Sequence, residues 1–62
     1  MSAKRVTWTY FDENDEYLFM AETLAKHSPK IGMKVRVNDT NYMVWYIEDG
    51  RGVNNARLER MP

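Results

Sequence analysis

The sequence predicts a mainly β protein, in which about five short antiparallel strands form a small, partly open barrel or roll. Three observations predict it. Residues 33–37 alternate apolar and basic side chains, and the turn-forming residues 38–41 follow them. Residues 42–47 form an unbroken apolar run rich in β-branched and aromatic side chains. The 62 residues include two tryptophans, four tyrosines and two phenylalanines, enough large apolar side chains for one core, so residues 1–62 are expected to form a single domain.

The first strand is expected at residues 4–11. Val6, Trp8 and Tyr10 alternate with residues that point to the other face of the strand, among them Thr7 and Phe11. The acidic cluster 12–15 then interrupts the apolar pattern. These features predict a strand that ends at a polar turn.

Residues 15–26 have two interpretations. In the first, residues 12–15 are a four-residue hairpin loop, residues 16–22 are the second strand, and residues 23–27 form a helical turn. In the second, Asn14 caps a helix over about 15–26, which gives an α+β fold with that helix on a β-sheet. Apolar residues at helical spacing favour the helix, whereas Leu18 and Phe19 make the segment apolar on nearly all sides, as in a buried strand. We favour the hairpin.

The remaining strands are expected at residues 30–37, 42–48 and 55–61. A proline-bounded loop with Gly32 at a bend precedes the first of them. The segment 49–52 contains two glycines and reads as a flexible connection. No repeat or low-complexity tract interrupts this organisation.

The strand at 42–48 is apolar on both of its predicted faces. Strict alternation puts three side chains on each: Tyr42, Val44 and Tyr46 on one, and Met43, Trp45 and Ile47 on the other. One face enters the core of a small barrel. The other is expected to be covered by the N-terminal hairpin or helix, by a second copy of the chain or by a different partner, because exposed apolar surface of this size is costly.

The pattern P-x-I-G-x-x-V at residues 29–35, followed by Y-x-V at residues 42–44, is similar to that of many small proteins of bacteria and their phages. It also resembles the strand-turn-strand of small barrels of the Src-homology-3 type. The resemblance covers about a third of the chain and implies a shape, not an activity, because one fold hosts many functions.

Composition narrows the classes of function. The chain has no cysteine and a single histidine, His27, so neither a disulfide nor a cysteine or histidine metal site is expected. No cofactor is expected either. The residues contain no pattern of nucleophile, base and orienting group, so we expect no enzyme. The sequence shows neither a secretory leader nor an apolar run near 18 residues, which predicts a cytoplasmic protein without a membrane partner.

The expected function is therefore that of a non-enzymatic protein-interaction module, such as a phage or prophage accessory protein that binds a bacterial protein. Tryptophan and tyrosine are favoured at interaction hot spots, and acidic residues can steer a basic partner. The candidate anchors are Trp8, Tyr10, Trp45 and Tyr46, and the candidate steering acids are Asp12, Glu13, Asp15 and Glu16.

Two other functions remain open. A small barrel can hold single-stranded nucleic acid by stacking and phosphate contacts, for which the candidate residues are Lys34, Arg36, Arg51 and Arg57. The formal net charge of zero weighs against this use, because phosphate binding usually needs a basic excess. The third function is structural, with self-association through exposed strand edges and the uncovered aromatic face into a homo-oligomer, either a dimer or a larger ring.

Overall fold

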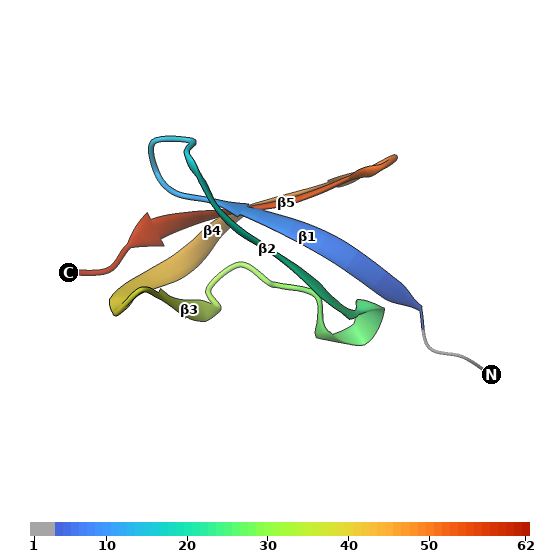
Figure 1. The fold of residues 1–62 in the computed structure, drawn as a ribbon, viewed down its shortest axis with the longest axis horizontal. Coiled ribbons are helices and arrows are strands. Elements are labelled where there is room, and N and C mark those ends of the chain that lie inside the picture. The colour runs from blue at the N-terminus through green and yellow to red at the C-terminus, as the bar shows by residue number, and fades with distance from the viewer. Residues whose placement is uncertain (1–3) are drawn as a thin grey trace.

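A single curled sheet of five strands makes up nearly the whole molecule (Figure 1). The computed structural model describes residues 4–62. Its elements, in chain order, are β1 (Arg5–Phe11), β2 (Tyr17–Leu24), the 3-10 turn η1 (Ala25–His27), β3 (Lys34–Val37), β4 (Thr40–Gly50) and β5 (Val53–Arg60). The predicted mainly β class, with strands curled into a half-open barrel, is confirmed. None of the helical structure in residues 4–62 is long and apolar enough to cross a membrane.

The strand order in the sheet is β2-β1-β5-β4-β3, so the first and last strands are neighbours at its centre. Three of the four pairings are antiparallel, as predicted, but β1 and β5 run parallel. Each connection along the chain reverses the strand direction, and two odd-numbered strands therefore run the same way. When they lie side by side they can only be parallel.

The helical interpretation of residues 15–26 is wrong. This segment forms β2, and only Ala25–His27 has a helical turn. Cross-strand pairing with β1 outweighs the helical propensity of the segment, since it buries apolar side chains from both strands. Tyr10 and Phe19 are directly opposite and stack with ring centroids 4.4 Å apart and planes within 7°.

The β3–β4 hairpin is confirmed, but its turn has two residues instead of the predicted 38–41, and β4 begins at Thr40 because Thr40 and Asn41 already pair with β3. Asn38 and Asp39 both have positive φ, 48° and 66°, which matches the demand of a tight hairpin for left-handed residues. β3 begins later than predicted, at Lys34, because residues 30–33 form a turn in which Met33 N–H donates to Lys30 C=O at 3.0 Å. Gly32 lies in this turn with a φ of 95°.

The core lies on the inner, concave face of the sheet. Its fully buried residues come from β1, β4 and β5 and are Trp8, Tyr10, Tyr42, Val44, Ala56 and Leu58. Half-buried residues of the edge strands, including Phe19 and Val35, pack against them. The predicted alternation of β1 is confirmed, since the side chains at Trp8 and Tyr10 are buried and the residues between them are more exposed.

A β-bulge interrupts the pairing of β4 with β5. Val44 is opposite Leu58, yet Tyr46 is opposite Arg57, so Trp45 is an additional residue without a partner on β5. An unpaired residue reverses the alternation of every side chain that follows it. The bulge therefore decides which side chains of the second half of β4 reach the surface.

The strict alternation predicted for residues 42–47 is wrong beyond this bulge. Tyr46 does not share the inner face with Tyr42 and Val44; it lies on the outer face and is 44% exposed. Ile47 takes the inner position instead, opposite Ala56, and packs against the core. One bulge thus replaces an aromatic side chain in the core by an aliphatic one.

Candidate partner-binding surface

Four side chains form a row across the outer face of the sheet, one from each of four adjacent strands. The pairing registers place Tyr17 of β2 opposite Phe11 of β1, Phe11 beside Arg57 of β5, and Arg57 opposite Tyr46 of β4. We call these four residues the outer row. Residues that share a register position point to the same face, so the row is continuous across the middle of the sheet.

Contacts within the outer row hold its side chains against one another. The Phe11 and Tyr17 rings meet edge to face, with centroids 6.5 Å apart and planes at 80°. The Arg57 guanidinium carbon lies 5.9 Å from the centroid of the Tyr46 ring, within the range of a cation–π contact. The Trp45 ring adjoins the end of the row, 5.7 Å from Tyr46. The contacts therefore form two groups, Tyr17 with Phe11 and Arg57 with Tyr46 and Trp45, and the register of β1 with β5 places these groups side by side.

Three aromatic side chains of this surface are exposed, whereas Phe11 is half-buried. Tyr17 is 61% exposed and Trp45 is 46% exposed. Single exposed apolar residues are common on proteins, but neighbouring ones that expose large rings mark sites of interaction. Rigid rings also lose little conformational entropy when they are covered.

Arg57, at the centre of the outer row, is neutralised by the β1–β2 loop. Its Nη1 lies 2.7 Å from Asp15 Oδ1, and its side chain is only 33% exposed. Asp15 has a positive φ of 65°, which turns the loop back over the sheet. This ion pair ties the loop to β5 and leaves the middle of the row without excess charge.

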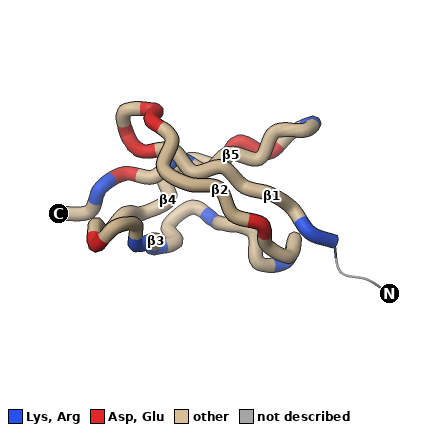
Figure 2. The backbone as a smooth tube through the Cα atoms, in the orientation of Figure 1, with Lys and Arg blue, Asp and Glu red and all other residues tan. Residues whose placement is uncertain are grey.

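Acidic residues are concentrated at the turn between β1 and β2 (Figure 2), and the Asp15–Arg57 ion pair brings this loop to the outer row. Asp12 organises this loop, because its Oδ1 accepts hydrogen bonds from Asn14 N–H at 2.8 Å and Glu16 N–H at 2.9 Å. Glu13 Oε1 lies 3.9 Å from Arg60 Nε. Within residues 4–62, Glu16 has no ion-pair partner, so of the four predicted steering acids it carries the least compensated charge.

Two of the predicted anchors, Trp8 and Tyr10, are not on the surface. They are 2% and 7% exposed because period-two alternation points both to the inner face of the central strand β1. Trp8 Nε1–H donates to Ser28 Oγ at 3.3 Å, which satisfies its polar group within the fold. Burial raises the pKa of the Tyr10 hydroxyl above its ordinary value. Both residues hold the core together and cannot contact a partner in this fold.

Sequence reasoning missed Phe11 and Tyr17 as surface aromatics. Alternation did indicate the position of Phe11, because it places Phe11 on the other face of β1 from Trp8 and Tyr10. Helical spacing places Tyr17 in the apolar stripe of the helix that the structure rules out. Only its pairing with Phe11 shows that Tyr17 lies on the outer face of the sheet. Of the four predicted anchors, Trp45 and Tyr46 do lie on the surface.

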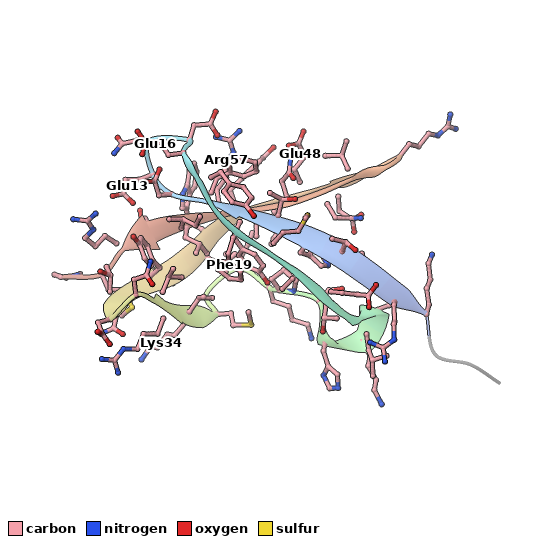
Figure 3. All side chains as sticks on the ribbon, viewed as in Figure 1. Glu13, Glu16, Phe19, Lys34, Glu48 and Arg57 are labelled. Carbon is pink, nitrogen blue, oxygen red and sulfur yellow. The ribbon has the colours of Figure 1, made fainter. Side chains whose placement is uncertain are left out.

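The four candidate nucleic-acid residues do not form one basic patch. Figure 3 shows Arg57 with Glu13 and Glu16 on the upper side of the curled sheet, and Lys34 on its lower side. Arg36 Nη2 is 3.4 Å from Asp39 Oδ1, and Arg51 lies in the turn between β4 and β5. Curvature of the sheet separates residues that would face one way on a flat sheet.

Among the residues that the structure describes, no group of three or more histidines and carboxylates is placed to hold a metal ion. Comparisons with protein-family models, with curated proteins and with solved structures found no significant match. The resemblance to a small barrel of the Src-homology-3 type stays a prediction.

Proposed function

We propose that this protein is a small, non-enzymatic interaction module that binds a protein partner through the outer row and Trp45. One observation carries the proposal: the surface formed by the outer row and Trp45 is largely aromatic, and its Tyr17, Tyr46 and Trp45 side chains are exposed, although the core of the same sheet is already filled. Surfaces of this composition are enriched at interaction hot spots. The partner proposed from the sequence is a bacterial protein, with the chain acting as a phage or prophage accessory factor in the cytoplasm.

The chemistry of the surface favours a partner with apolar and basic side chains. The rings supply apolar contact area, and burial of one large aromatic side chain stabilises a complex by up to about 3 kcal/mol. Asp15 pairs with Arg57 at the centre of the outer row, and Glu16 directly precedes Tyr17, so a basic rim on the partner complements this acidic loop.

Affinity capture with matched variants tests the proposal. Tagged protein is incubated with nuclease-treated bacterial lysate, and the retained proteins are identified by mass spectrometry. Tyr46→Ala and Trp45→Ala are expected to lose the stoichiometric partner at least tenfold. Ile31→Ala is the control, because Ile31 is 68% exposed and lies outside the outer row. The proposal is wrong if the partner is retained equally by all three variants.

The same experiment distinguishes the two other predicted functions. Proteins that are retained from untreated lysate but lost after nuclease treatment, together with an affinity that falls steeply with salt, indicate nucleic-acid binding. An empty column, with light scattering that shows a dimer or larger ring, indicates self-association through this surface.

A further inference from the structure

β1 and β5 pair along only part of their length. The parallel ladder joins Thr9–Phe11 to Asn55–Arg57 and stops there. Toward the N-terminal end of β1 the two strands diverge, and Figure 1 shows β1 and the β4–β5 hairpin separating like the arms of a V. An open cleft of about 700 Å³ lies between them, lined by residues of β1, of η1 and of the β4–β5 hairpin.

The β1 wall of this cleft presents unpaired main-chain groups. Lys4 C=O accepts a hydrogen bond from Ala25 N–H at 2.9 Å, so it points toward the β2 side. Successive residues of a strand direct their N–H and C=O groups to opposite edges. The groups of Arg5 and Thr7 therefore point the other way, into the cleft. No strand within residues 4–62 pairs with this edge at Arg5–Trp8.

The opposite wall presents a matching group. Thr9 and Phe11 direct their main-chain groups to β5, so on β5 the alternate residues, Asn54 and Ala56, direct theirs to β1. The next step of the ladder would join Asn54 N–H to Thr7 C=O. The ladder ends before it, and this donor and this acceptor remain apart on facing walls of the cleft.

We propose that this cleft is a second binding site, which takes an extended peptide segment of another protein as an additional strand. An extended main chain is the ligand whose donors and acceptors repeat at the spacing of an open strand edge, and added strands bind by this means. The open edge spans four residues, about 13 Å of strand. The site is separate from the outer row, since the cleft is lined by none of those side chains.

The lining residues define the side chains that such a peptide carries. Val6 provides an apolar floor on the inner side of the cleft, next to Ser28, whereas Trp8 lies behind it and is almost completely covered. Three charged residues line the cleft: Lys4, Arg5 and Asp49. Arg5 Nη1 lies 3.5 Å from Glu22 Oε1, so Lys4 and Asp49 are left with opposite charges and the site has no strong preference for peptide charge. The expected ligand alternates apolar side chains, which face the floor, with polar side chains, which face solvent.

Amide hydrogen exchange tests the premise on the protein without a ligand. Val6 and Trp8 amides, which point toward β2, are expected to exchange at least tenfold more slowly than those of Arg5, Thr7 and Asn54. If the latter three are already protected, and more so at higher protein concentration, a second copy fills the cleft and the proposal is overturned.

Selection from a displayed library of random octapeptides then tests the ligand. Peptides are selected on the wild-type protein and counter-selected on Thr7→Pro, which removes an N–H from the cleft edge but none from the β1–β2 pairing. Thr7→Val, which keeps the N–H, is the matched control. The synthesised peptide is expected to bind the wild type and Thr7→Val alike and Thr7→Pro at least tenfold more weakly.

The bound peptide must also slow exchange at Arg5, Thr7 and Asn54 at least tenfold in the wild-type protein, a result that needs no variant to fold. Trp45→Ala is expected to leave this binding unchanged, which separates the cleft from the function proposed for the outer row. Protection at the outer edge of β2 or β3 instead, or failure to enrich any peptide on the wild type over Thr7→Pro, overturns the proposal.

Discussion

The two tryptophans occupy opposite environments although both lie in strands. Trp8 is enclosed in the core, and Trp45 lies at the bulge with nearly half of its surface exposed. In Trp45→Phe the only remaining tryptophan is Trp8, and we expect its fluorescence emission to be blue-shifted and only weakly quenched by acrylamide. Tyr46→Phe is the control, since it keeps both tryptophans. Strong quenching of the remaining tryptophan in Trp45→Phe would contradict the burial of Trp8.

Tyr10 makes the stability of the fold sensitive to alkaline pH. Burial raises the pKa of the Tyr10 hydroxyl in the folded state above the value of about 10 that it has in the unfolded chain. At a pH between these two values the folded protein keeps the hydroxyl proton and the unfolded chain releases it. The free energy of unfolding therefore falls as pH rises above about 10. Near neutral pH the hydroxyl is protonated in both the folded and the unfolded state, so Tyr10 causes no pH dependence there. Urea unfolding at pH 8 and pH 11 is expected to show a smaller loss for Tyr10→Phe than for wild type. An equal loss would mean that other groups cause the alkaline sensitivity.

At the scale of elements, the β4 bulge accounts for both the filled core and the exposed row. Because Trp45 is the unpaired residue, its deletion converts β4 into a regular strand that keeps Tyr46 opposite Arg57 and Ile47 opposite Ala56. We expect the fold to survive this deletion, with a change in unfolding free energy of about 1 kcal/mol.

Deletion of Met43 is the matched control, since it also removes one residue from β4. To keep the rest of the pairing, Trp45 must then take the inner position opposite Leu58 that Val44 now fills. Val44 is fully buried, so the larger ring overpacks the core at a cost of about 3 kcal/mol or more. Circular dichroism during thermal unfolding compares the two deletions; equal stability would show that the bulge does not lie at Trp45.

The elements that follow a strict period of two were predictable from the sequence. Alternation identified β1 and its buried residues, and the polar cluster at 38–41 identified the β3–β4 hairpin, although the turn itself is only Asn38 and Asp39. The bulge was not predictable, because residues 42–47 are apolar at every position and no polar residue marks the change of face. The outer row was only half predictable for the same reason: its members are neighbours through register, which the one-dimensional pattern does not contain.

For the whole molecule, the small core leaves little reserve of stability. A domain of 62 residues is expected to have an unfolding free energy of about 3 to 9 kcal/mol. Leu58 is fully buried, and Leu58→Ala is expected to cost about 2 to 5 kcal/mol, much of that total. Urea unfolding at 25 °C measures the loss. The exposed control Met20→Ala, on β2, is expected to change stability by about 0.5 kcal/mol or less.

The central pairing of β1 with β5 also determines when the protein can fold during its synthesis. The β1–β2 hairpin can form early, but its neighbour in the finished sheet is the last strand in the chain. Until Val53–Arg60 has left the ribosome, the edge of β1 that pairs with β5 has no partner. The apolar face that contains Trp8 and Tyr10 then stays uncovered. Contacts between such distant segments form slowly, so this apolar face is open to aggregation until β1 and β5 have paired.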